Sequence, residues 1–356
     1  MPTTMNPEAS TRRAFSLDCI VDEYADRDAW LIGRQSLIGA SDTAGIFGVG
    51  YSDQSPITIY DSKVNPPREV ADPVKLKRFT VGKLMEPALR AIFTEETGIP
   101  CESPGPFTIH RHRDLPWLGC SLDAQTVHDD YGFCPIELKN VSNFNKADWI
   151  AGYDADDDED QPEEGGPLKF QVQLQHQMAV TGASHGFLLG LIGGNEPIVK
   201  TIARNDRFIK AMLAKLEEFW GYVQRRELPP VDSSIVTGRI LAKIWPKESG
   251  ATAVMPADAT RWSAELETAK EIIKAMKAVK VAAENQIKAA IGESTFGELP
   301  IDRNSGDVKQ ETMERLLKAA REIPCESLPV RYSWKQQSRA AHTVKASEFR
   351  VLMGCK

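Results

Sequence analysis

Two patterns of hydrophobic and polar positions run along this chain, and the first predicts helices. Between residues 81 and 97 apolar side chains recur every three or four positions, and Gly98 follows directly, where glycine commonly ends a helix. Residues 168–181 and 206–226 are also expected to be helical, the second as a long amphipathic helix. The proline pair at 229–230 closes this part of the chain.

The second pattern consists of short apolar runs bounded by turn residues, which are typical of strands. It predicts five strands, at 106–112, 117–124, 132–140, 186–193 and 197–204. Asp-Asp-Tyr-Gly at 129–132 is a turn between two of them. The order of elements is helix, meandering strands, helix, strands, helix. This order indicates an α/β sandwich with a mixed central sheet flanked by helices.

The N-terminal part of the chain carries weaker signals. Residues 1–25 are expected to be a disordered arm. A short helix is expected at 28–32, and Ser41 is well placed to cap the helix that follows. Residues 61–77 are rich in proline and charge and are expected to form a linker.

A change of composition divides the chain after residue 230. We therefore expect a main domain at 26–230 and a C-terminal extension at 231–356. Within the extension, apolar residues recur at four-three spacing and predict a helix of about 45 Å at 258–291. That helix is expected to pack against the core or against a partner helix. A terminal hairpin that includes residues 330–335 is expected to follow.

Composition excludes several classes of protein. The 356 residues are 42% hydrophobic and 26% charged, which is ordinary for a globular protein. No segment approaches about 18 uninterrupted apolar residues, and residues 1–16 lack the apolar centre of a signal peptide. We expect a soluble cytoplasmic protein with no membrane partner. The six cysteines show no CxxC spacing, which argues against a zinc ribbon or an iron–sulfur cluster.

The formal net charge of −7 gives little information about nucleic-acid binding. Eight acidic residues crowd into 154–164, and without them the remainder is close to neutral. Residues 154–166 are expected to form a mobile acidic loop. A calcium-binding loop is not indicated, because Glu159 stands where an EF-hand requires glycine.

The strongest chemical signal is a Glu-x-Lys pair on a predicted strand. Side chains alternate along a strand, so Glu137 and Lys139 project to one side while Leu138 points into the core. If Asp123 ends the neighbouring strand, two carboxylates and one ammonium converge. Such a trio can hold a divalent cation and activate a water molecule, which is the equipment for hydrolysing a phosphodiester.

Other polar residues could complete this site, but none does so on its own. Glu86 overlooks the same cleft, although a solvated helix residue is the simpler interpretation. Four glutamines at odd positions in 171–177 cannot share one helical face, so most are expected to face solvent, and one, Gln173, could face a metal-bound water. Arg34 is a bidentate phosphate donor by chemistry, and Ser41 offers a hydroxyl.

Six short motifs occur in one chain order: Trp30-x-x-x-Arg34, Ile38-Gly39-Ala40-Ser41, Gly82-Lys83-Leu84-Met85-Glu86-Pro87, Ser121-Leu122-Asp123, Ile136-Glu137-Leu138-Lys139 and Gln173-x-x-x-Gln177-Met178. Together they resemble the YqaJ-type viral recombinase family, which is lambda-exonuclease-like and part of the PD-(D/E)xK nuclease superfamily. The resemblance spans about 28–230 and implies a restriction-endonuclease-like fold. The proline of the superfamily motif is Leu122 here. The tail at 332–335 is similar to the Trp-Lys hairpin that ends many members.

The resemblance assigns catalytic and metal-binding roles. Asp123 and Glu137 match the metal-binding carboxylates, and the carbonyl of Leu138 matches a backbone ligand between them. Lys139 matches the lysine that positions the attacking water. Glu86 matches a helix acid that orients metal-bound water.

The resemblance also implies a site for the end of a DNA strand. Gln173 matches the glutamine of the following helix, with Gln171 as the alternative if the register slips by two. Arg34 and Ser41 match residues that hold a terminal 5′ phosphate, and Trp30 matches the aromatic residue that supports them.

The function implied is that of a Mg²⁺-dependent exonuclease that degrades linear duplex DNA from 5′ to 3′ and leaves 3′ single strands. One or two ions per site are expected, with Mn²⁺ as a substitute. A single-strand annealing protein is the expected partner, and the expected assembly is a homo-oligomeric ring, such as a trimer. The alternatives are an endonuclease or repair nuclease of the same fold, and a catalytically silent DNA-binding scaffold.

Overall fold

The computed structural model describes residues 18–65, 72–150, 166–245, 251–295 and 305–321. The chain forms two compact units, Met1–Pro246 and Lys247–Lys356, and each is described by itself. The expected terminal hairpin lies outside the described residues, and so does all of the expected acidic loop except Gly166.

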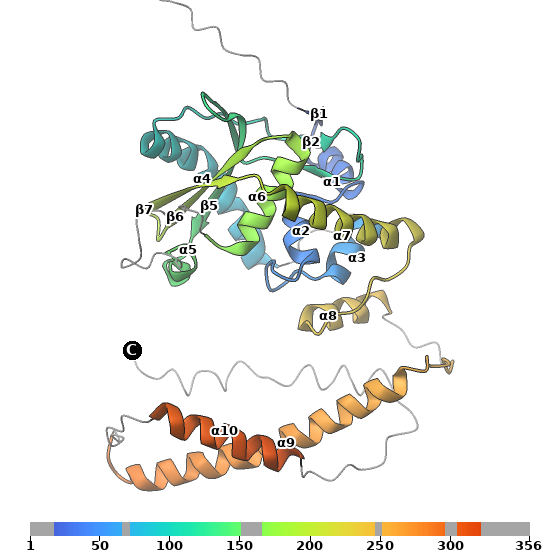
Figure 1. Cartoon of the computed structure of the whole chain (residues 1–356), viewed down its shortest axis with the longest axis vertical. Helices are drawn as coiled ribbons and strands as arrows, with labels where there is room; N and C mark the ends of the chain where they lie inside the picture. The colour runs from blue at the N-terminus through green and yellow to red at the C-terminus, as the bar shows by residue number, and fades with distance from the viewer. Residues whose placement is uncertain (1–17, 66–71, 151–165, 246–250, 296–304, 322–356) are drawn as a thin grey trace, which may run out of the picture. The chain divides into compact units, whose positions relative to one another are not determined.

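The first unit is built around two sheets (Figure 1). Three antiparallel strands form the smaller sheet in the order β1 (Cys19–Glu23), β2 (Thr108–His112) and β3 (Gly119–Cys120). The larger sheet has the order β4 (Ala124–His128), β5 (Gly132–Val141), β6 (His185–Ile192) and β7 (Glu196–Ala203). Its β5–β6 pair is parallel and the other two pairs are antiparallel, which confirms the mixed sheet and the α/β class.

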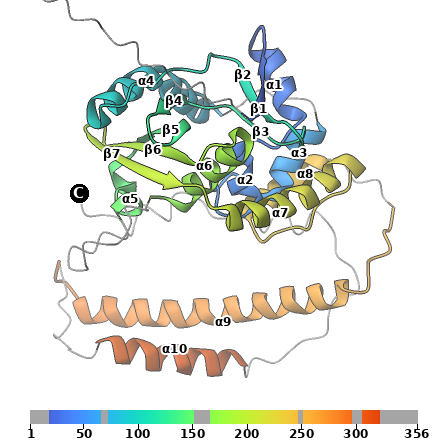
Figure 2. The ribbon, with the colours of Figure 1, turned by 45° about the horizontal axis from the view of Figure 1, so that its top comes forward.

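Helices flank the larger sheet on both faces (Figure 2). On one face, α4 (Pro73–Thr97) packs Leu89 and Phe93 against apolar side chains of β5 and β6. On the other face lies α6 (Leu168–Thr181), whose Phe170 packs against Leu188 of β6. The remaining helices of this unit are α1 (Arg27–Gln35), α2 (Ala40–Ile46), α3 (Pro56–Val64), the short η1 (Asn143–Asn145), α5 (Ala147–Ile150), α7 (Asp206–Arg225) and α8 (Ile235–Ile244).

Most predicted elements lie where the sequence places them. The single strand expected at 117–124 is wrong, because this segment contains β3 and only the first residue of β4, which belong to different sheets. The bounds of α6 are those predicted, and α4 ends at Thr97 with Gly98 in the left-handed region at φ 70°. The linker expected at 61–77 is wrong at both ends, because α3 continues to Val64 and α4 begins at Pro73. Proline suits the first position of a helix, where its missing N–H costs no hydrogen bond.

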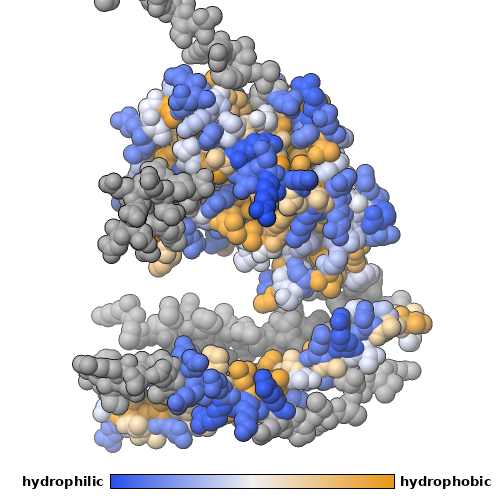
Figure 3. Space-filling model, in the orientation of Figure 1, coloured by the Kyte–Doolittle hydropathy of each residue, from blue (hydrophilic) through white to orange (hydrophobic). Residues whose placement is uncertain are grey.

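The second unit contains α9 (Ala259–Ile291) and α10 (Ser305–Arg321). The first of these confirms the long helix predicted at 258–291, and none of its residues is buried. Hydrophobic and hydrophilic residues are interspersed on the surface of this unit (Figure 3). Packing of α9 against a partner helix stays a prediction. In the part of the chain that the structure describes, no helix is both long and apolar enough to cross a membrane.

The boundary between the units differs from the one expected at residue 230. The first compact unit extends to Pro246 and includes α8. The Thr237 hydroxyl on this helix donates a 2.8 Å hydrogen bond to the Ser55 hydroxyl at the start of α3, and both side chains are buried. This contact ties α8 to the main domain.

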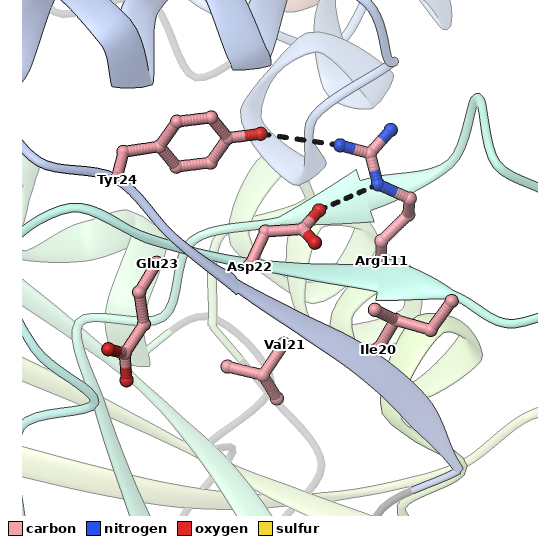
Figure 4. A pocket seen from close by; sticks show the side chains of 6 residues that line it. All are labelled: Ile20, Val21, Asp22, Glu23, Tyr24 and Arg111. Carbon is pink, nitrogen blue, oxygen red and sulfur yellow. Dashed lines mark hydrogen bonds and ion pairs between the residues drawn. The ribbon is translucent and has the colours of Figure 1, made fainter.

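The disordered arm expected at 1–25 is wrong for its last part. Cys19–Glu23 forms β1 and pairs along its whole length with β2. Asp22 and Arg111, on neighbouring strands, form an ion pair of 2.8 Å, and Arg111 also reaches the Tyr24 hydroxyl at 3.4 Å (Figure 4). Residues 1–17 lie outside the described residues.

Candidate active site

The site begins with the alternation of side chains along β5. Ile136 and Leu138 pack in the cluster beneath α4, as expected for one face of a strand. Glu137 and Lys139 project to the opposite face, where α6 covers the sheet. The Glu-x-Lys pair therefore lies between β5 and α6.

Glu137 is completely buried, and both of its carboxylate oxygens accept hydrogen bonds from α6. Gln173 donates to Oε1 at 2.5 Å and Gln177 donates to Oε2 at 2.6 Å. The Lys139 ammonium forms an ion pair with the same carboxylate. Burial, followed by the nearby charge of Asp123, raises the pKa of Glu137 to about 7.

Asp123 immediately precedes β4 and lies beside Glu137 because β4 and β5 pair antiparallel, with Ala124 opposite Ile136. One oxygen, Oδ2, accepts a hydrogen bond from the backbone N–H of Leu138 at 3.0 Å. The same oxygen is 3.2 Å from the Lys139 ammonium. The structure thus brings together the two carboxylates and the ammonium that the sequence predicts.

Lys139 is the cation that joins the two carboxylates. Burial alone would lower its pKa, but Asp123 and Glu137 outweigh this effect and raise the pKa above its ordinary value. The side chain is therefore held protonated. Its ammonium also lies 5.4 Å from the centre of the Phe170 ring, a cation–π distance.

Glu86 lies on α4, at the side of this trio. It is half-buried, and burial followed by the charge of Asp123 raises its pKa. Its carboxylate is therefore within electrostatic reach of Asp123. The described residues contain no group of three or more His, Cys, Asp or Glu side chains arranged as a ready set of metal ligands.

The glutamines of α6 have distinct partners. Gln171, the alternative to Gln173, donates instead to the Gly166 carbonyl at 2.7 Å. The expectation that most of the four face solvent is wrong, since Gln175 and Gln177 are buried. Sequence reasoning missed Gln177 as a partner of Glu137. The signal was its spacing of four from Gln173, which places both on one helical face.

The structure also brings together the three residues expected to bind a terminal phosphate. Arg34 Nη2 is 3.4 Å from the Ser41 hydroxyl, and its guanidinium lies 4.8 Å from the centre of the Trp30 ring. The Trp30 indole N–H donates to the Ser121 hydroxyl at 3.2 Å. The cluster of Trp30, Arg34 and Ser41 is called the arginine pocket below. Since Ser121 is two residues before Asp123, this hydrogen bond connects the arginine pocket to the carboxylate site.

The expectation that Ser41 caps a helix is wrong. The N-cap of α2 is Gly39, and Ser41 is the second residue of the helix. The backbone N–H of Gly39 donates to the Asp42 carboxylate at 2.9 Å, so Asp42 takes the capping role. The Ser41 hydroxyl is therefore directed to Arg34 rather than to the backbone.

Tyr51 is a second residue that sequence reasoning missed. Burial raises the pKa of its hydroxyl, and the charges of Lys139 and Glu137 also act on it. About half of the side chain is exposed, and the Lys169 ammonium lies 4.9 Å from the ring centre. Gln54 accepts from the Tyr51 N–H at 3.0 Å and donates to the Ser41 carbonyl at 3.3 Å. No motif in the sequence marks Tyr51.

The donor set at the carboxylates fits a hard divalent cation. Asp123, Glu137 and the backbone carbonyl of Leu138 all supply oxygen, which such ions prefer. The pKa of Glu137 is raised in part by the charge of Asp123, so the two carboxylates repel each other, and a bound cation would relieve that repulsion.

A mixed sheet with an aspartate immediately before β4 and Glu-x-Lys on β5 has the arrangement of a D…(D/E)xK site. Residues 29–184 match the model of the YqaJ-like viral recombinase domain. These residues are therefore similar to the YqaJ-like viral recombinase domain, as the motifs indicate. A protein of Bacillus subtilis (strain 168) described as "Uncharacterized protein YqaJ" is 26% identical over 275 residues, which cover 76% of this chain and 80% of the relative.

Two solved structures are also similar. The alkaline exonuclease LHK-Exo from Laribacter hongkongensis is 18% identical with a TM-score of 0.40, and the match covers 56% of this chain and 94% of that one. LHK-Exo in complex with dAMP is 19% identical with a TM-score of 0.41, and that match covers 61% of this chain and 100% of the other.

Proposed function

We propose that this protein is a metal-dependent DNA exonuclease that degrades linear duplex DNA from 5′-phosphorylated ends and leaves 3′ single strands. One observation carries the proposal. The carboxylate–lysine site of Asp123, Glu137 and Lys139 is joined through Ser121 and Trp30 to the pocket of Arg34. A phosphodiester-cleaving site and a pocket for a strand end are thus neighbours. The match of residues 29–184 to the model of the YqaJ-like viral recombinase domain supports this assignment.

In this proposal the carboxylates hold the metal and the surrounding residues hold the carboxylates. Asp123, Glu137 and the Leu138 carbonyl would hold one or two Mg²⁺ ions, or Mn²⁺ in their place. Bound there, such an ion would supply polarisation of the scissile phosphate and a lowered pKa for a water molecule. Gln173 and Gln177 keep the Glu137 carboxylate in one orientation by binding both of its oxygens.

The cationic and acidic neighbours act on the substrate and the water. The protonated Lys139 orients the attacking water and stabilises negative charge that develops on the phosphate. Glu86 on α4 lies within electrostatic reach of Asp123. From this position it orients water at the edge of the site.

The arginine pocket selects the end of the strand. Arg34 binds the terminal phosphate through its planar guanidinium, the Ser41 hydroxyl adds a hydrogen bond, and the Trp30 ring supports the guanidinium. A pocket for a terminal phosphate distinguishes an exonuclease from a nuclease that cuts within a strand.

The proposed surroundings of the enzyme follow from this activity. We place it in the cytoplasm, where it would supply 3′ single strands to a single-strand annealing protein in phage-type recombination. A ring of identical subunits around the duplex would make it processive. The C-terminal unit with α9 and α10 would form a separate extension of the nuclease domain.

The test compares four DNA substrates in Mg²⁺: a linear duplex with 5′-phosphate ends, the same duplex with 5′-hydroxyl ends, a closed circle, and a linear duplex labelled at one 3′ end. The proposal requires nucleotides to be released fastest from the 5′-phosphorylated duplex, the circle to stay intact and the 3′ label to remain on a long strand. Cutting of the circle at an equal rate would instead indicate an endonuclease. Duplex binding without cleavage in Mg²⁺ or Mn²⁺ would indicate a scaffold.

A further inference from the structure

Lys63, near the C-terminal end of α3, lies beneath the arginine pocket. Its ammonium forms an ion pair of 2.7 Å with Asp42 Oδ2. It also donates to the Arg34 carbonyl at 3.2 Å. The side chains of Lys63 and Asp42 are only 6% and 15% exposed, so the pair is largely removed from water and weakly screened.

Asp42 is close to Arg34 as well as to Lys63. A Cβ atom built on Gly39 would lie 3.3 Å from Asp42 Oδ2 and 3.6 Å from Arg34 Nη2, so the carboxylate and the guanidinium border the same small space. Burial alone would raise the pKa of Asp42, but Lys63, followed by Arg34, outweighs this effect and lowers it. Asp42 is therefore a carboxylate with two neighbouring cations.

The closer of these cations is Lys63. It holds Asp42 at ion-pair distance, while the contact from Arg34 Nη2 to the Ser41 hydroxyl is long at 3.4 Å. Arg34 therefore has no strong anionic partner of its own among the described contacts. Without Lys63, the Asp42 carboxylate would be left largely buried, and Arg34 would be the nearest cation able to neutralise it.

We propose that Lys63 is a positioning residue that neutralises Asp42 and thereby leaves Arg34 free to bind the terminal phosphate of the DNA. This inference rests on the proposed function. Arg34, Lys63 and Asp42 together carry a formal charge of +1, and removal of Lys63 reduces it to zero. Lys63 thus sets the preference for 5′-phosphorylated over 5′-hydroxyl ends without touching the DNA.

The test is a double-mutant cycle with Lys63→Met and Asp42→Asn. Its readout is the ratio of kcat/KM for 5′-phosphorylated and 5′-hydroxyl linear duplexes, because a general loss of structure lowers both values. Lys63→Met should lower this ratio by about tenfold, as expected when an arginine–phosphate contact is weakened. With Asp42→Asn already present, Lys63→Met should change the ratio by less than about twofold.

Two controls separate the charge from other effects. Lys63→Arg keeps the cation and should keep most of the ratio. Lys146→Met removes a lysine from another ion pair of 2.7 Å, with Glu196 on β7, and should leave the ratio unchanged. Should Lys63→Met fail to fold, Lys63→Gln takes its place in the cycle with the same expected outcomes, because glutamine removes the charge and keeps a hydrogen-bond donor beside Asp42.

The inference is overturned if Lys63→Met keeps the wild-type ratio, or if the double variant is as impaired as Lys63→Met. The ratio of the Kd values for the two duplexes, measured without metal, separates a failure of this inference from a failure of the proposed function. A wild type that binds phosphorylated ends more tightly but hydrolyses neither duplex contradicts only the exonuclease proposal. A binding preference that does not depend on Lys63 contradicts only this inference.

Discussion

The amide of Gln177 donates a 2.6 Å hydrogen bond to Glu137 Oε2, from one fully buried side chain to another. Gln173 occupies the other oxygen of the same carboxylate. A buried carboxylate is costly unless it is paired and hydrogen-bonded. The two glutamines and Lys139 meet this requirement and fix the orientation of Glu137.

Removal of the Gln177 amide should raise the pKa of Glu137 further, because a hydrogen bond to the charged form favours that form. If hydrolysis needs ionised Glu137, Gln177→Leu should lose about tenfold in rate at pH 7 and recover as the pH rises. The rate of nucleotide release in Mg²⁺ from pH 6 to pH 9 measures this. Gln171→Leu is the matched control, since Gln171 binds the Gly166 carbonyl instead. An unshifted profile in Gln177→Leu would refute the role of the amide.

The Glu137–Lys139 site could be predicted because it depends on local rules. A strand alternates its faces, and an antiparallel neighbour places Asp123 beside Glu137. The spacing of four between Gln173 and Gln177 is also a local signal, because it places both residues on one face of a helix. The role of Gln177 could not be predicted from this spacing alone, since it depends on the burial of this face of α6. Burial of a polar residue depends on the partner that meets it, and here the partner is 40 residues away.

The Tyr51 ring should stack against a base of the bound DNA, because it is half-exposed, lies within reach of the carboxylate site and is connected through Gln54 to Ser41. Tyr51→Ala should raise KM for duplex DNA by about tenfold, a typical loss for one aromatic–base contact. Tyr51→Phe keeps the ring and should stay within about threefold of wild type. Steady-state kinetics on a 5′-phosphorylated duplex give both values. Equal impairment of the two variants would assign the effect to the hydroxyl and contradict stacking.

His176 should make the folded state less stable in acid. Its imidazole is buried between the Thr43 hydroxyl at 2.7 Å and the Gly119 carbonyl at 3.0 Å, and burial lowers its pKa to about 4. The unfolded chain takes up this proton near its ordinary pKa of 6.5, so stability is full above that pH and falls between pH 6.5 and 4. The expected loss from this group is about 2 kcal/mol between pH 7 and pH 5.

Chemical unfolding of wild type and His176→Gln at pH 7 and pH 5 tests this expectation. The variant should show a smaller loss on acidification, although it starts from a lower stability. His110, whose pKa burial also lowers to about 4, stays in both proteins and contributes equally. If the two proteins lose the same free energy of unfolding between these pH values, the buried imidazole is not responsible.

The contact between Thr237 and Ser55 predicts where the nuclease domain can be shortened. A chain that ends at residue 230 loses α8 and leaves the buried Ser55 hydroxyl without this partner. Its free energy of unfolding should be lower than that of a chain that ends at residue 246 by at least about 1 kcal/mol, so it should unfold at a lower denaturant concentration. Thr237→Val in the longer chain should reproduce part of the difference. Identical unfolding midpoints for the two lengths would place the boundary at 230 after all.

Three elements show why other parts of the fold could not be predicted. β1 was missed because five residues with little alternation are recognisable as a strand only beside β2, which lies far along the chain. The cap of α2 was misassigned because Asp42 and Ser41 are both good capping residues, and the choice depends on Arg34 and Lys63. The extent of the main domain depends on α8, whose anchor Ser55 is 182 residues before Thr237.

The central claim is that Asp123, Glu137 and Lys139 hydrolyse DNA from its 5′-phosphorylated ends. The most direct measurement is the rate at which wild type and Lys139→Ala release mononucleotides from a 5′-phosphorylated linear duplex in Mg²⁺, with duplex binding measured in parallel. We expect wild type to digest the duplex and Lys139→Ala to bind it while losing at least about a hundredfold in rate. A variant that releases nucleotides at the wild-type rate would contradict the account.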